Sequence, residues 1–111
     1  MQALFCVVNN PDRLQDVLTG LLELGVTSAT IIESQGMGKI VGENVSIFAG
    51  FRDLWSGSKD FNHTLFAVIE DDQVQEAVSI IKDILSVEKS ESRGVLFTIP
   101  VSNFFKLSDP R

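Results

Sequence analysis

The side chains best suited to nucleophilic or acid–base chemistry near neutral pH are the single cysteine, Cys6, and the single histidine, His63. Cys6 lies in the apolar run Leu4–Val8, which predicts an inert core thiol rather than a nucleophile. His63 follows a long irregular segment and is expected on the surface. The adjacent acids Asp71 and Asp72 precede a helical pattern, where carboxylates stabilise a helix N-terminus. Because no acid–base pair marks a defined site, we predict no catalytic residues and no enzymatic activity.

Length, charge and cysteine content narrow the class of protein. The chain has 111 residues, one Cys and a formal net charge of −6 from 9 Lys+Arg and 15 Asp+Glu. One Cys excludes an intrachain disulfide framework and a multi-cysteine zinc cluster. The acidic balance argues against nucleic acid as a partner, since phosphate binding needs a cationic face. No apolar run approaches the roughly 20 residues that span a bilayer, and no signal peptide is visible. We therefore expect a single domain over residues 1–111, in the cytoplasm, without membrane insertion.

The hydrophobic pattern divides the chain into two similar halves. The predicted elements, in chain order, are a strand at 2–8, a helix between Asn10 and Gly25, a strand at 29–33, a strand from 64 to 69, a helix from the Asp71–Asp72 pair through Leu85, and a strand at 95–101. Leu4–Val8 recurs as Leu65–Ile69, and Leu14–Leu18 recurs as Val74–Val78. Two such units predict an α+β, ferredoxin-like βαββαβ sandwich, with an antiparallel sheet and two helices on one face.

Residue types at the helix ends and on the helix faces support this assignment. Asn10 is expected to cap the first helix, with Pro11 at its first position and Gly25 after its end. Asp71 and Asp72 are expected to cap the second helix. The residues expected on the two core-facing helical faces are Leu14, Val17, Leu18, Leu21 and Leu22, and Val74, Ala77, Val78, Ile81, Ile84 and Leu85.

The segment between the second and third predicted strands, residues 35–63, is far longer than a usual hairpin connection. It carries Phe51, Leu54 and Trp55 at the spacing of one helical turn, beside Arg52 and other charged residues. An apolar patch mixed with charges suits a segment that docks on a partner protein. The alternative is that its aromatic residues pack on the open face of the sheet.

The predicted strands are apolar on both faces, although the helices cover only one. Phe5 and Val7 of the first strand, with Phe66 and Val68 of the third, alternate with the residues expected under the helices. The uncovered face therefore needs a lid or another subunit. We expect self-association through the sheet, with the apolar tail at residues 102–111 contributing to it.

Residues 25–39, GVTSATIIESQGMGK, form the most specific motif of the chain. This run resembles the PII signal-transduction family, whose members carry G-(I/V)-T-G-x-T-V-x-E-x-x-G-x-G-(R/K) at this place. The opening strand and helix, and the closing run Gly94–Val101, are also similar to the family's layout. The resemblance therefore covers nearly the whole chain in topology.

The resemblance implies a homotrimer whose sheets face a central axis, and it identifies residues 35–63 as the family's long T-loop. That loop docks on target enzymes, membrane transporters or channels, and Phe51, Arg52, Leu54 and Trp55 are its expected partner-binding residues. The family regulates rather than catalyses, in nitrogen and carbon metabolism. It binds adenine nucleotides such as ATP or ADP between subunits and often senses 2-oxoglutarate.

The same resemblance implies a ligand cleft between subunits. The residues expected to line it are Thr30, Gly36, Gly38, Lys39, Arg93, Gly94 and Lys106. Glycines allow close backbone approach to a ligand, and cationic side chains attract phosphate or carboxylate. The alternative reading is turn-forming glycines and solvated lysines.

Several positions depart from the family's pattern. The loop before the last strand commonly reads T-G-x-x-G-D-G-K in the family. Here it reads VEKSESRG followed by Val95, which adds Glu88 and Glu91 and leaves Arg93 as the candidate substitute for the lost lysine. The family's R-I-R is Lys106, Leu107 and Ser108 here, and the chain has no Tyr for T-loop modification. Because each lost cation and each added carboxylate weakens anion binding, we expect a divergent member with weakened phosphate binding.

Two other functions fit the same fold. A CutA-like trimeric metal-handling protein would need clustered metal ligands, for which one Cys and one His are a poor supply. An acylphosphatase-like enzyme would need an Arg in a phosphate-cradling loop after the first strand, where this chain has Asn9, Asn10 and Pro11. The predicted function is therefore a PII-like regulator that binds a small anionic effector between subunits.

Overall fold

The computed structural model describes residues 1–37, 62–87 and 94–107. Its elements, in chain order, are strand β1 (Gln2–Val8), helix α1 (Pro11–Glu23), strand β2 (Thr30–Ser34), strand β3 (Asn62–Ile69), the 3-10 turn η2 (Asp71–Gln73), helix α3 (Val74–Leu85) and strand β4 (Val95–Pro100). All six predicted elements are present, and the ends of β2, β3 and β4 differ from prediction by one or two residues. Within these ranges no helix is long and apolar enough to cross a membrane.

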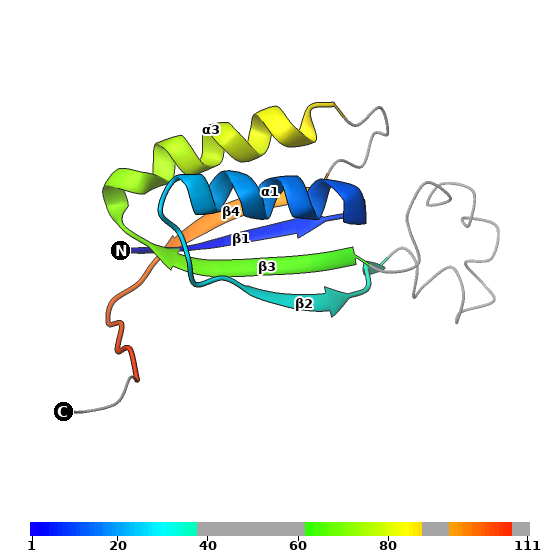
Figure 1. Ribbon diagram of the computed structural model, residues 1–111. Helices are drawn as coiled ribbons and strands as arrows, with labels where there is room; N and C mark the ends of the chain where they lie inside the picture. Colours follow the sequence, from blue (N-terminus) through cyan, green and yellow to red (C-terminus); the bar gives the residue numbers. More distant parts are fainter. Residues whose placement is uncertain (38–61, 88–93, 108–111) are drawn as a thin grey trace.

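The strands form one antiparallel sheet in the order β2-β3-β1-β4, so β2 and β4 are its edge strands. The register places Phe5 of β1 between Phe66 of β3 and Phe97 of β4. Both helices cover the same face of the sheet, and no described helix covers the other face (Figure 1). This arrangement confirms the predicted α+β, ferredoxin-like fold.

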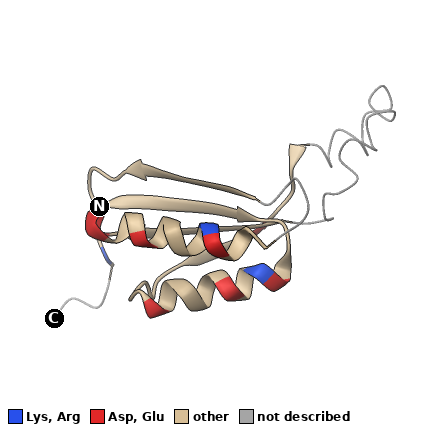
Figure 2. Cartoon of the chain, turned by 90° about the horizontal axis from the view of Figure 1, so that it is seen from above, with Lys and Arg blue, Asp and Glu red and all other residues tan. Residues whose placement is uncertain are grey.

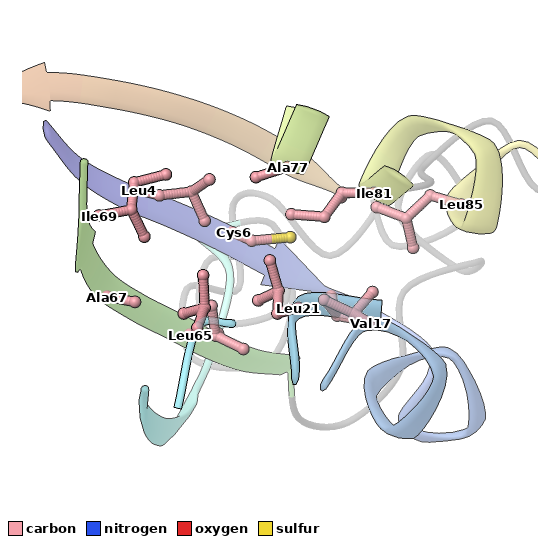
Figure 3. Packing of buried hydrophobic residues seen from close by; sticks show 12 residues of the cluster. Leu4, Cys6, Val17, Leu21, Leu65, Ala67, Ile69, Ala77, Ile81 and Leu85 are labelled. Atoms are coloured by element: carbon pink, nitrogen blue, oxygen red, sulfur yellow. The ribbon is translucent and has the colours of Figure 1, made fainter. Parts of the chain in front are cut away.

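The hydrophobic core lies between the sheet and the helices. Successive strand residues point to opposite faces, so β1 and β3 each send alternate side chains toward the helices. The buried residues are Leu4, Cys6, Val8, Val17, Leu21, Val26, Leu65, Ala67, Ile69, Ala77, Ile81 and Leu85. Figure 3 shows these strand and helix side chains pointing toward one another. The core therefore buries the helix-facing side of the two central strands, and the apolar residues on their other side lie outside it.

Helix α1 begins and ends as its sequence predicts. The Asn10 side chain accepts a hydrogen bond from the backbone N–H of Asp12 at 3.0 Å, and Pro11 occupies the first helical position. Gly25 follows the helix with a φ of +96°, a conformation that favours glycine. The prediction for Leu22 is wrong: its side chain is 61% exposed, because α1 buries a narrower stripe that contains Val17 and Leu21.

Helix α3 begins differently from prediction. Asp71 and Asp72 do not cap it; they lie in the preceding turn η2. Glu70 and Gln73 form a capping box at the start of η2, in which the Gln73 side chain accepts from the Glu70 backbone N–H at 2.9 Å. Asp71 pairs with the Met1 ammonium at 3.0 Å, and hydrogen bonding to that ammonium lowers the pKa of the Asp71 carboxyl. The residues on either side of the two acids therefore cap η2, and α3, which follows η2 directly, has no side-chain cap of its own.

Candidate functional site

Gly94 lies directly before β4, at the end of the sheet where β1 ends. Its φ is +126°, and a Cβ atom here would clash with the carbonyl oxygen of Val7. The backbone of Gly94 therefore runs against β1 more closely than any other residue type would allow. Gly94 has a structural requirement for glycine in addition to the ligand contact that the sequence suggested.

Gly36 lies at the same end of the sheet, two residues after β2. A Cβ atom at Gly36 would lie 3.4 Å from Nδ2 of Asn62, the first residue of β3. Nearby, the hydroxyls of Ser34 and Thr64 share a hydrogen bond of 2.8 Å across β2 and β3. The Oδ1 atom of Asn62 is buried and has no hydrogen-bond partner among the residues that the structure describes. An amide oxygen beside Gly36 is thus available to a donor from a ligand or a second chain.

Asn62 did not emerge from the sequence as a candidate. What marks Asn62 as a candidate is its buried oxygen without a hydrogen-bond partner among the described residues. This property depends on how Gly36 packs against β3, and it cannot be predicted from a polar residue type at the start of a strand. His63 beside it is half-buried, and its Nδ1 atom has no hydrogen-bond partner among the described residues, so the expectation of a surface histidine is only partly met.

Thr30 and Lys106 line two separate hollows elsewhere on the molecule, and Phe104 borders both of them. Thr30, Ser28 and Phe104 line a hollow of about 270 Å³. Lys106 and Phe104 line a neighbouring hollow of about 390 Å³ with residues 25–28. Phe104 is common to both hollows, and it is another residue that the sequence did not single out as part of a site. The C-terminal tail therefore places a cation beside the start of β2.

The structure separates the described candidates into two groups. Gly36 and Gly94 lie where β2 ends and β4 begins, whereas Thr30 and Lys106 lie around Phe104 where β2 begins. The remaining candidates, Gly38, Lys39, Phe51, Arg52, Leu54, Trp55 and Arg93, lie outside the described residues. One chain does not bring its four described candidates into a single pocket.

Positive charge is scarce in the described part of the chain. Its only Lys and Arg residues are Arg13, Lys82 and Lys106, and Arg13 forms an ion pair with Asp16 at 2.9 Å. Figure 2 shows acidic residues along both helices. Lys82 lines a hollow of about 700 Å³ that Gly94 also lines, and Lys106 lines the hollow of about 390 Å³ beside Phe104. Lys82 and Lys106 are therefore the two described cations placed beside a hollow, where they can attract an anion.

The open face of the sheet carries a row of stacked aromatic rings. The centroid of Phe5 lies 5.9 Å from that of Phe66 and 4.9 Å from that of Phe97, with both pairs stacked. Phe97 is 47% exposed, and Val95, Ile99 and Ile32 on the same face are also exposed. A continuous apolar surface of this kind marks an interaction site on a soluble protein.

Cys6, one of the two side chains with catalytic potential, is not accessible as a nucleophile. Cys6 is buried in the core, and burial raises the pKa of its thiol to about 11. It is therefore protonated and shielded near neutral pH, as the sequence predicted. Within the ranges that the structure describes, no three His, Cys, Asp or Glu side chains lie together as metal ligands.

Comparison with known proteins gives one result that spans the chain. Residues 2–109 match the family model described as nitrogen regulatory protein P-II. No curated protein matches the chain.

Proposed function

Because the chain belongs to the nitrogen regulatory protein P-II family, a family of regulatory, non-catalytic signal proteins, we propose that it binds a small anionic effector between the subunits of a trimer. Members of the family are typically trimers that interact with target proteins. We further propose that residues 1–111 act as a single domain in the cytoplasm. The observation that carries the proposal is the separation of Thr30 and Lys106 from Gly36 and Gly94 within one chain.

The open sheet face supports the trimer. The stacked rings of Phe5, Phe66 and Phe97 would lose their contact with water if the sheets of three copies faced a common axis. Burial of apolar surface contributes roughly 25 cal/mol per Å², so covering this face would strongly favour association. The apolar face that the helices leave open would then form the contact between subunits.

The two groups of candidate residues support a cleft between copies. In a cyclic assembly, one surface of each copy meets a different surface of the next. The end that carries Gly36 and Gly94 can then meet the Thr30 and Lys106 group of a neighbour. This arrangement explains how residues from opposite parts of one chain serve a single ligand.

An adenine nucleotide such as ATP or ADP is the effector that we propose. Lys106 would attract its phosphates, and the backbone beside Gly36 and Gly94 would allow close approach. The unpartnered Asn62 Oδ1 can accept a hydrogen bond from a ligand amine or hydroxyl. The sequence also places Glu88 and Glu91 before Gly94, and these carboxylates oppose phosphate. We therefore expect an affinity below that of a site with the family's full set of cations.

The regulatory output would pass through residues 35–63, the T-loop by family resemblance. Phe51, Arg52, Leu54 and Trp55 combine apolar surface with charge, a composition that suits protein recognition. We propose that this segment docks on a target enzyme or membrane transporter of nitrogen or carbon metabolism.

Calorimetric titration with ATP and ADP tests the effector. We predict binding by the native protein and an affinity at least roughly tenfold lower for Lys106→Ala, since a charge-assisted hydrogen bond contributes about 1.5–3 kcal/mol. Lys106→Arg is the matched control, because it keeps the positive charge at this position, and its affinity should stay close to the native value. Equal affinities for Lys106→Ala and the native protein would contradict the role of Lys106.

The alternative is a CutA-like trimeric metal-handling protein, which shares the fold. No observation on the described residues favours it over the effector-binding regulator. Titration of the same protein with Zn²⁺ and Cu²⁺ distinguishes the two proposals: the regulator predicts no stoichiometric metal binding, and tight binding of one metal per chain would favour the alternative.

A further inference from the structure

We propose that the Gln73 side chain ties residues 25–28 to η2 and thereby holds the hollow beside Lys106 in a fixed shape. Gln73 is a positioning residue, because it acts on the wall of the hollow through hydrogen bonds to the backbone. This inference rests on the proposed function, since the hollow is one part of the proposed ligand cleft.

The Gln73 amide joins two parts of the chain that are far apart in the sequence. Its Oε1 atom accepts a hydrogen bond from the backbone N–H of Glu70 at 2.9 Å. Its Nε2 atom donates to the carbonyl oxygen of Leu24 at 3.5 Å, across 49 positions of sequence. Leu24 is the C-cap of α1. One side chain therefore connects η2, in the second half of the chain, to the end of the first helix.

The chain turns sharply at the point where Gln73 holds it. The backbone N–H of Gly25 donates to the Leu22 carbonyl at 3.0 Å, and that of Val26 donates to the Leu21 carbonyl at 2.9 Å. This pair of bonds is a Schellman motif, in which Gly25 takes the positive φ of +96°. A Cβ atom at Gly25 would lie 3.9 Å from Nε2 of Gln73. The amide therefore lies against the turn that directs residues 26–29 toward β2.

The turn matters because its residues form a wall of the hollow. Residues 25–28 line the hollow of about 390 Å³ together with Gln73, Phe104 and Lys106. Residues 26–29 are described as irregular chain rather than helix or strand. A wall of irregular chain has to be ordered when a ligand binds, and this ordering lowers affinity unless the wall is already fixed. The bond from Gln73 fixes one end of the wall before binding.

A neutral amide suits this position better than a carboxylate. The three residues before Gln73 are the acids Glu70, Asp71 and Asp72, and all three are exposed, whereas Gln73 is half-buried and lines the hollow. An anion attracted by Lys106 therefore meets an amide at this wall and not a fourth carboxylate, which would repel it. The amide also supplies the acceptor for Glu70 and the donor for the α1 end from one side chain.

Backbone amide hydrogen exchange, followed by NMR, tests the tie without any ligand. Gln73→Glu keeps an oxygen that accepts from the Glu70 N–H but loses the donor to the Leu24 carbonyl. We expect the Val26 amide, relative to the amides of β3, to exchange roughly threefold to tenfold faster than in the native protein. A purely global loss of stability would accelerate both sets of amides together.

The matched control for exchange is Glu70→Ala, which removes the other half of the capping box and leaves the Gln73–Leu24 bond in place. Its relative exchange rate at Val26 should equal the native value. Equal relative rates in Gln73→Glu and the native protein would overturn the proposal, as would an equally large increase in Glu70→Ala.

Calorimetric titration with ADP tests the consequence for binding. Gln73→Met keeps a neutral side chain of similar length and loses both hydrogen bonds, and we expect its affinity to fall by roughly threefold or more, because the ligand must then order the wall. Glu70→Ala should bind no more weakly than the native protein. Native affinity in Gln73→Met overturns the positioning role even if exchange at Val26 is faster. A native protein that binds no ADP overturns the proposed effector instead, and the exchange rates, measured without ligand, then decide the tie.

Discussion

Cys6 illustrates how a single buried residue links the sequence to a measurable property. Its thiol lies between β1 and the helices with no exposed surface, and burial raises its pKa from 9.0 to about 11. At pH 8 the thiol is therefore protonated and shielded, and we predict no reaction with an aromatic disulfide reagent in the native protein. The same sample should react with one equivalent of reagent after unfolding in guanidinium chloride. Rapid reaction of the native protein would contradict the burial of Cys6.

The same pKa shift makes stability depend on alkaline pH. The unfolded chain releases the Cys6 proton near pH 9, whereas the folded chain holds it until about pH 11. The folded state therefore binds more protons between these values, and the free energy of unfolding falls as pH rises through this window. The loss is of order 2 kcal/mol, since each pKa unit corresponds to about 1.4 kcal/mol. Denaturant unfolding at pH 8.5 and 10.5 measures it. The variant Cys6→Ala should show a flatter dependence, and equal slopes would refute the assignment.

The residue scale also shows what a motif cannot reveal. The sequence assigned Gly94 to a ligand loop by resemblance, but the clash that any Cβ would make with the Val7 carbonyl arises from the approach of two strands. No sequence motif pointed to Asn62 or Phe104. The unsatisfied oxygen of Asn62 and the position of Phe104 between two hollows arise only when the chain folds. The family resemblance supplied the candidate ligand positions, and their role in ligand binding stays a prediction.

At the scale of elements, Gly20 sets the approach of the two helices. A Cβ at Gly20 would lie 2.6 Å from Cγ2 of Ile80. This atom cannot move away easily, because the χ1 rotation of a β-branched side chain is restricted in a helix. Gly20→Ala gains roughly 0.8–1 kcal/mol of helix propensity but overpacks the interface at about 1–3 kcal/mol. We predict net destabilisation, measured by denaturant unfolding.

A second variant isolates the steric cause. In an Ile80→Ala background the obstructing Cγ2 atom is absent, so Gly20→Ala should stabilise α1 through its propensity alone. Destabilisation of similar size in both backgrounds would show that the helices do not meet at these two residues.

Element boundaries were predictable where local chemistry decides them. Asn10, Pro11 and Gly25 define α1 through hydrogen bonding and backbone preference that involve only near neighbours. The start of α3 was less predictable, because four consecutive residues from Glu70 to Gln73 can each accept hydrogen bonds, and the reciprocal Glu70–Gln73 pair forms. The exposure of Leu22 depends on where α3 lies beside α1, which periodicity does not specify.

At the scale of the whole molecule, the alternation of apolar residues predicted both the fold and the apolar sheet face that the helices do not cover. The helices cover one side of the sheet, and the stacked row of Phe66, Phe5 and Phe97 lies on the other. The separation of the candidate site into two groups could not be predicted from one sequence, since it depends on where the tail returns to the sheet. Under the proposed function, this separation would make assembly a condition for ligand binding.

We propose that the ligand cleft exists only between copies of a trimer, and the mass of the protein in solution is the direct test. Size-exclusion chromatography with multi-angle light scattering at micromolar concentration should give three times the chain mass of 12.2 kDa. Phe97→Asp, which places a charge on the open face, should shift the mass toward one chain while leaving the secondary structure intact. A native protein that runs as a monomer of 12.2 kDa would contradict the account.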